Sequence, residues 1–316
     1  MYTVPIDNKE TILVPYGFYY VGGNLDTGIV ISDRKEDNNK YAGKNEDGSI
    51  KNVGTDLVGN QFVWIPCELS NYSKTSWGNT YQSSNWDTTI SDTEIKQIQK
   101  YSGFYVARYE AGLDINKAHT SNLSSTSNYH DNETAKPQSK AGLIPWNFVS
   151  WNTSKARAQE MYNTISVSSG LITGTQWDVM INTIASKTGA SLTNPDWGNY
   201  YNIPITYTGG AANTYFQTGV FTGTGGTKNE SERKLLYTGS SVQCMKYNLY
   251  DVAGNVWEWT EEVAFRSGNT DTGYRISRGG DNYNMSNKYP VCYRLGDYSV
   301  TGTDQDIGFR VVLYIW

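Results

Sequence analysis

Apolar and polar residues alternate with a period of two in several short stretches of this chain, the spacing that predicts half-buried strands. These alternating stretches cover residues 16–20, 29–31 and 103–112, and a short apolar strand closed by proline is predicted at 59–66. The last residues, 307–316, form a continuous apolar run, which predicts a strand buried on both faces. Long polar stretches separate the strands and are expected to be loops or insertions: 32–58, 68–100 and 113–140.

Helical spacing, with a period of 3.6, occurs in the middle of the chain. One helix is predicted after the cap residue Ser150, with an apolar face made of Ala158, Met161, Tyr162 and Ile165. A second is predicted after Thr173, which stands in capping-box spacing with Gln176, and a short one is indicated at 91–100. Two main helices among short strands and long ordered loops predict an α+β fold. We expect one domain over residues 1–316, because no linker divides the chain.

Composition changes this picture in two ways. Tyrosine and tryptophan are abundant and charged residues make up only 18% of the chain, so aromatic rings must supply much of the buried area. The net charge of −5, without any Lys/Arg-rich run, argues against nucleic acid as a partner. No apolar run has the length of a membrane span, and no signal-peptide pattern begins the chain. The sequence leaves its location open between a phage particle, a cell surface and the cytoplasm.

Seven motifs follow one another along nearly the whole chain: FVWIP, GFYVARYE, VSW, SGLITGTQWD, NLYDVAGNVWEWTEE, SRGG and IGFRVV. In this order they resemble the formylglycine-generating-enzyme type of C-type lectin fold, and GNVWEW and GFR are the most specific. The resemblance implies two helices with short, twisted antiparallel sheets and long ordered loops. The family includes oxidases, iron-dependent sulfur-transfer enzymes and the non-catalytic variable proteins of diversity-generating retroelements. In the variable proteins, the segment between RGG and GFR forms a ligand-binding surface diversified by mutagenic reverse transcription.

The residues needed for the family's enzymatic branches are incomplete. An oxidase needs two cysteines shortly after RGG, because paired sulfur ligands hold copper. Cys292 resembles the second of them, but Asn284 stands at the fourth position after RGG, where nothing supplies the first. The iron-dependent branch needs three histidines, and the chain contains only His119 and His130. We therefore predict no catalysis and no redox cofactor, with a copper- or oxygen-dependent oxidase that uses Cys292 as the alternative.

Other chemically active side chains are expected to be structural. Glu261 and Glu262 are adjacent on a predicted strand, so they point to opposite faces and are expected to be surface charge. Both histidines fall in polar stretches and are expected to be solvated. Arg278 and Arg310 are expected to lie inside the protein.

The stretch LYDVAGNVWEW has the composition of a calcium loop. Calcium prefers hard oxygen ligands, and an irregular loop can offer carboxylates and backbone carbonyls together. The resemblance implies one structural calcium ion, held at the positions of Asp251, Gly254, Val256 and Glu258. Closure without metal is the alternative, with an Asx-turn at Asp251 and an ion pair between Glu258 and an arginine such as Arg278 or Arg310.

The segment 281–306, between SRGG and IGFRVV, has no regular period and mixes tyrosine with Asn, Ser, Gly and Asp. Antibody paratopes have the same composition, because tyrosine gives a large contact area at a small entropy cost. Most of its residues are also reachable from asparagine codons by adenine-directed substitution. The predicted ligand-binding residues are Tyr283, Asn284, Tyr289, Val291, Tyr293, Leu295, Asp297, Tyr298, Val300 and Asp304.

Together these patterns predict a non-catalytic ligand-binding protein, the variable protein of a diversity-generating retroelement from a bacterium or phage. Its expected partner is a protein or a cell-surface molecule, which it meets with residues 281–306.

Overall fold

A computed structural model describes residues 1–7, 10–113, 130–213, 218–265 and 273–316. These residues form three α-helices, α1 (Asp92–Tyr101), α2 (Trp151–Met161) and α3 (Gly174–Thr188). Ser91 and Thr173 close capping boxes on α1 and α3, and the Ser150 side chain accepts the backbone N–H of Thr153 in α2. The three predicted helix starts are therefore confirmed. Short 3-10 helices also occur, at Lys35–Asp37, Leu69–Asn71, Asn79–Tyr81 and Val242–Cys244.

The predicted end of the helix that follows Ser150 is wrong. α2 ends at Met161, the backbone of Tyr162 is extended, and Ile165 is 98% exposed. The Ser169 hydroxyl donates to the carbonyl of Ala158 near the end of this helix. The chain turns there and enters strand β10 (Val167–Leu171), which pairs with the C-terminal strand.

A six-stranded antiparallel sheet forms the first layer of the core. Its strand order is β10 (Val167–Leu171), β22 (Val311–Ile315), β7 (Gly103–Ala107), β5 (Gln61–Pro66), β4 (Val30–Ser32) and β3 (Tyr19–Gly22). β22, β7 and β5 are almost completely buried. The apolar run at 307–316 predicted this for β22, whereas the alternation at 103–112 predicted only a half-buried strand for β7. The α+β class is thus confirmed, with α1 as a short addition to the two main helices.

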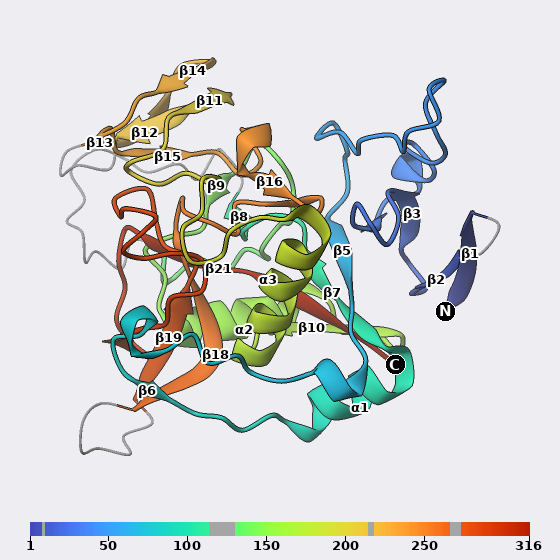
Figure 1. Ribbon diagram of the computed structural model, residues 1–316, viewed down its shortest axis with the longest axis horizontal. Helices are drawn as coiled ribbons and strands as arrows, with labels where there is room; N and C mark the ends of the chain where they lie inside the picture. Colours follow the sequence, from blue (N-terminus) through green and yellow to red (C-terminus); the bar gives the residue numbers. More distant parts are fainter. Residues whose placement is uncertain (8–9, 114–129, 214–217, 266–272) are drawn as a thin grey trace.

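A second sheet carries the motif-rich C-terminal half. Its order is β20 (Leu295–Ser299), β19 (Tyr274–Arg278), β18 (Trp257–Phe265) and β21 (Ile307–Phe309), and β6 (Asn85–Trp86) also pairs with β18. β18 and β21 are parallel, whereas the other pairs are antiparallel. α2 packs on β10 and β18, and α3 on β5 and β18, so both helices join the two sheets (Figure 1).

The predicted single strand over 307–316 is divided between the two sheets. Ile307–Phe309 belongs to the second sheet and Val311–Ile315 to the first. Arg310 lies at the crossing point and is fully buried, as predicted for this arginine. Its ion pair with Glu258 holds the chain where it changes sheets, which a purely apolar pattern does not reveal.

Small sheets decorate this core. They contain β1 (Tyr2–Asp7) with β2 (Glu10–Val14), β8 (Gly112–Leu113) with β9 (Ile144–Pro145), β11 (Ile205–Thr208) with β14 (Gly225–Lys228), β12 (Ala211–Asn213) between β13 (Thr218–Thr222) and β15 (Lys234–Leu236), and β16 (Met245–Lys246) with β17 (Leu249–Tyr250). The β1–β2 hairpin and the β11–β15 strands lie at opposite ends of the molecule (Figure 1). Within the described residues, no helix is long and apolar enough to cross a lipid bilayer.

Candidate ligand-binding site

The segment 281–306 leaves the second sheet through two glycines. Gly279 and Gly280 follow β19 with φ angles of 99° and 76°, where side chains other than hydrogen are strained. A Cβ atom on Gly280 would lie 2.5 Å from the Tyr200 ring and 2.6 Å from the Tyr289 carbonyl oxygen. The turn that begins the segment therefore requires glycine, which explains the RGG motif.

The segment lines a cavity of about 310 Å³ together with residues from other parts of the chain. Six of the ten predicted binding residues lie around it: Tyr283, Asn284, Tyr289, Leu295, Tyr298 and Asp304. Tyr283 is the most exposed tyrosine of the group, at 46%. Much of the predicted surface is thus brought together into one pocket.

Four predicted residues do not line this cavity. Tyr293 is half-buried and meets the Trp257 ring edge-to-face, Asp297 is exposed, and Val300 is half-buried against the core. Val291 is fully buried, so its prediction as a contact residue is wrong. Its carbonyl accepts the Trp177 indole N–H, and its side chain joins the core.

Several residues around the cavity escaped the sequence prediction. They are Arg233, Trp257, Asp281, Gln305, Asp306 and Ile307. Asp281, Gln305 and Asp306 lie inside the segment and Ile307 follows it directly, so counting the polar residues at both ends of the segment, and one residue beyond its end, would have found all four. Trp257 belongs to the stretch LYDVAGNVWEW, which the sequence predicts as a calcium loop and not as part of the binding surface. Arg233 carries no sequence signal, because it lies about fifty residues upstream and only folding places it there.

Three carboxylates and one guanidinium line the cavity, and we call them the open cluster: Asp281, Asp304, Asp306 and Arg233. Asp281 Oδ1 accepts the backbone N–H groups of Tyr283 and Asn284 at 2.9 and 2.7 Å. The pKa of Asp281 is raised to about 8, mainly by burial; hydrogen bonding to Asn284 opposes this rise, and the charge of Asp304 adds to it. Burial and then its acidic neighbours raise the pKa of Asp306 as well.

A second set of three carboxylates and one guanidinium lies in the core, and we call it the closed cluster: Glu110, Asp251, Glu258 and Arg310. All four side chains are buried. Arg310 Nε donates to both oxygens of Glu258 at 3.1 and 2.9 Å, and its Nη2 donates to Oε1 at 2.5 Å. The predicted metal-free alternative for Glu258, pairing with Arg310, is therefore present. Trp257 and Trp259 lie in the core beside it.

Calcium at this loop stays a prediction. The Asp251 carboxylate accepts the Gly239 N–H at 2.7 Å, and Gly254 holds a φ of 75°. Among the described residues, no group of three His, Cys, Asp or Glu side chains is arranged for a metal, but the predicted set uses two carboxylates and two carbonyls. Three buried carboxylates against one guanidinium fit a further cation by charge. Asp251, Gly254, Val256 and Glu258 would hold the ion as a structural clamp.

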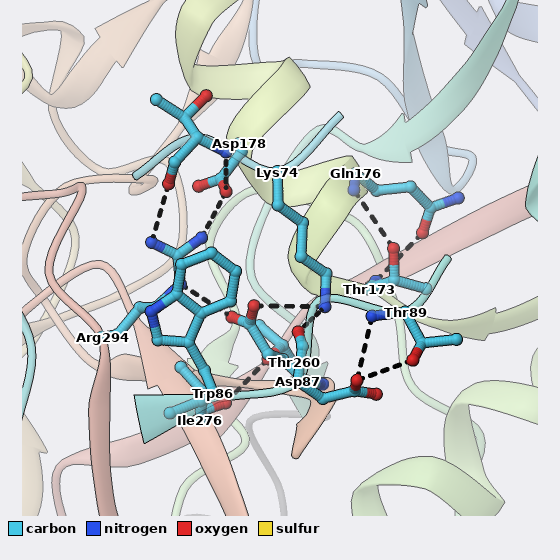
Figure 2. A network of polar contacts seen from close by, with 12 residues as sticks. Lys74, Trp86, Asp87, Thr89, Thr173, Gln176, Asp178, Thr260, Ile276 and Arg294 are labelled. Carbon is cyan, nitrogen blue, oxygen red and sulfur yellow. Dashed lines mark hydrogen bonds and ion pairs between the residues drawn. The ribbon is translucent and has the colours of Figure 1, made fainter. Parts of the chain in front are cut away.

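A network of buried ion pairs attaches the segment 281–306 to α3 and β18 (Figure 2). Arg294, within the segment, donates to Asp178 of α3 and to Glu262 of β18, and Trp86 lies over its guanidinium at 3.9 Å. Arg278 bonds the same two carboxylates, and Lys74 lies 3.3 Å from Glu262. The prediction of Glu262 as surface charge is wrong, because α3 and the segment bury it; Arg278 lies inside as predicted.

The candidate catalytic groups are also placed. The Cys292 thiol is fully buried, which raises its pKa to about 11, and the chain's three cysteines form no disulfide. His130 is buried and its Nδ1 lies 2.8 Å from the Asn147 carbonyl oxygen, so its prediction as a solvated residue is wrong. His119 lies outside the described residues.

Three comparisons relate the chain to known proteins. The sequence profile of the family described as the sulfatase-modifying factor enzyme 1-like domain matches residues 80–315. Variable protein 1 of Treponema denticola is similar with a TM-score of 0.43 and 13% identity, over 84% of this chain and 98% of that one. CarF is similar with a TM-score of 0.46 and 14% identity, over 82% of this chain and 100% of that one. PvdO from Pseudomonas aeruginosa is similar with a TM-score of 0.44 and 12% identity, over 84% of this chain and 98% of that one. Curated protein sequences gave no match.

Proposed function

The chain belongs to the sulfatase-modifying factor enzyme 1-like domain family, and we propose that it is a non-catalytic, ligand-binding member. In this proposal it is the variable protein of a diversity-generating retroelement. It binds a protein or cell-surface ligand with residues 281–306, while the two sheets and the buried ion pairs stay constant.

The cavity at residues 281–306 is the observation that supports this proposal most. Six predicted binding residues meet there, on a segment anchored through Arg294 and held by a glycine turn. A rigid scaffold under an irregular, tyrosine-rich segment is the usual arrangement of a recognition surface. The segment can change its exposed side chains without disturbing the anchors, because those anchors lie on the buried side.

The protonation state of the Cys292 thiol supports the proposal that the protein is not an enzyme. A thiolate, not a thiol, is the copper ligand and nucleophile, and a pKa of about 11 keeps this thiol protonated near neutral pH. The position four residues after RGG carries Asn284, so the paired thiolate of an oxidase is missing from the segment.

Sequencing the locus in many clones of one host tests the proposal directly. We expect substitutions at adenine positions to concentrate in codons 281–306 while codons 249–260 stay unchanged. A neighbouring reverse-transcriptase gene and a template repeat are also expected. An even spread of substitutions, with no such gene, would refute the retroelement assignment.

Copper binding tests the alternative of an oxidase. We expect purified protein to take up no stoichiometric Cu(I), and Cys292→Ser to leave this result unchanged. Stoichiometric copper that Cys292→Ser abolishes would favour the oxidase, because the thiol would then be a ligand despite its burial.

A further inference from the structure

The charges around the cavity are unbalanced. Three carboxylates face it and Arg233 is the one guanidinium among its lining residues. The whole chain carries a net charge of −5, so distant charges do not compensate for this excess. Burial raises the pKa of all three acidic groups, and a ligand cation is favoured because it stabilises their ionised forms.

The carboxylate of Asp306 is incompletely satisfied. Its Oδ1 is shielded from solvent and accepts no hydrogen bond from the described part of the chain. The other two carboxylates of the open cluster have donors: Asp281 accepts two backbone N–H groups, and Asp304 accepts the Tyr298 hydroxyl at 3.1 Å. A buried acceptor without a donor is costly, and Asp306 lines the cavity, so a ligand N–H group that reached this carboxylate would stabilise it.

Aromatic rings form much of the remaining wall. Trp257, Tyr283, Tyr289 and Tyr298 line the cavity. The guanidinium of Arg233 lies 3.3 Å from the centroid of the Tyr283 ring. Aromatic faces attract cations, and a planar guanidinium can stack on them while donating to carboxylates. The site thus already shows how a guanidinium is accommodated.

We propose that this cavity binds the guanidinium of an arginine side chain presented by a protein partner. The inference rests on the proposed function, and it specifies the chemistry of the ligand. Arginine fits better than lysine because its five donors, in a planar fork, can serve several carboxylates and one ring at once. Asp306 would accept from it, and the tyrosines would flank it.

The probe is N-acetyl-L-arginine amide, with the neutral isostere N-acetyl-L-citrulline amide as its matched control. We expect saturable binding of the arginine compound at millimolar concentration in NMR titration, and at least about tenfold weaker binding of citrulline. Equal binding of both compounds, or of neither, would overturn the inference. An N-acetyl-L-lysine amide that bound more tightly than arginine would overturn the choice of guanidinium.

Two variants test whether the arginine compound binds at Asp306. Asp306→Asn removes the acceptor charge, and we expect at least about fivefold weaker arginine binding, since charge-assisted bonds are the stronger kind. Asp196→Asn makes the same change at an exposed site outside the cavity and is expected to leave binding unchanged. Melting temperatures of both variants separate lost binding from lost folding. Unchanged binding in Asp306→Asn would refute the role of this carboxylate.

The pH dependence of arginine binding tests whether the carboxylates contact the ligand, because carboxylates with only a structural role would not change the affinity in this way. Burial raises the pKa of Asp281 to about 8 beside Asp304, Asp306, Arg233 and the Tyr298 hydroxyl. A cation stabilises the ionised form, so affinity should rise from pH 6 to pH 9 with release of protons. A flat profile would contradict the inference. The arginine tests could fail while sequence variation among clones is still concentrated in codons 281–306. That outcome would reject arginine as the ligand and leave the proposed function standing.

Discussion

The closed cluster and the open cluster have the same ionisable groups, three carboxylates and one arginine, yet their surroundings differ. In the closed cluster Arg310 comes from the crossing point between the two sheets and bonds Glu258 three times in the core. In the open cluster the arginine stacks on the exposed ring of Tyr283, and a carboxylate oxygen of Asp306 is left without a donor. The first cluster closes the scaffold, and the second has capacity left for a ligand.

This comparison teaches that a count of charged residues does not identify a binding site. The position of the counter-ion decides: Arg310 holds Glu258 inside the core, where only a structural ion could join the cluster, whereas the open cluster faces a cavity that a partner's side chain can enter. Most members of both clusters, all except Arg233 and Glu110, lie within a few residues of the GNVWEW, RGG and GFR motifs, so sequence position does not separate the two clusters.

The largest effect should come from breaking the closed cluster. Arg310→Met leaves the buried Glu258 carboxylate without its partner, and we expect a loss of about 3–5 kcal/mol in unfolding free energy, measured in urea. Arg34→Met, at an exposed position, is the control and should change stability by less than about 0.5 kcal/mol. A loss below about 1 kcal/mol for Arg310→Met would contradict the structural role of this pair.

A smaller loss is expected from Arg294→Met, which detaches the binding segment from α3 and β18. We expect about 2–3 kcal/mol, because Arg278 and Lys74 still pair with Asp178 and Glu262. Lys288→Met, exposed on the same segment, is the matched control. If both variants unfold alike, the segment is not anchored by Arg294.

The open cluster should destabilise the protein at high pH. The pKa of Asp281 is raised from 3.8 to about 8 on folding, so the folded state holds a proton that the unfolded state has lost between these values. Stability should therefore fall as pH rises from 4 towards 8, by at most about 1.4 kcal/mol per pH unit for this group. Thermal unfolding of wild type and Asp281→Asn isolates this contribution, and identical pH profiles would exclude it.

Calcium removal should have the smallest effect and should act through the closed cluster. We propose that EGTA lowers the melting temperature by about 1–3 °C, since a weak structural site at millimolar calcium contributes about 1 kcal/mol. Elemental analysis should find one calcium ion per chain, and Asp251→Asn should abolish the response. No retained calcium with an unmoved melting temperature would show that Arg310 alone closes the loop.

Much of the fold could be predicted from local patterns. Ser91, Ser150 and Thr173 marked the helix starts, because capping depends on neighbouring residues alone. The burial of β22 also followed from the apolar run at 307–316, whereas the alternation at 103–112 did not predict the complete burial of β7. The end of α2 and the division of residues 307–316 could not be predicted, since each depends on which distant strand the chain pairs with.

The candidate site divides in the same way. Tyr283, Tyr289 and Tyr298 could be predicted because composition and the framing glycines mark an irregular surface segment. Arg233 and the buried state of Glu262 could not, since one comes from a distant loop and the other is covered by α3 and its ion pairs. The prediction for Val291 was wrong because a segment without a regular period does not show which of its residues turns towards the core.

The sequence by itself determined the family's motifs, the helix caps, the glycine turn and the tyrosine-rich segment, since each rests on a few neighbouring residues. Only the tertiary structure decided which carboxylates received a guanidinium and which remained open to a cavity. Ionic pairing in a folded protein depends on distance in space and on burial, and neither quantity is written in local spacing.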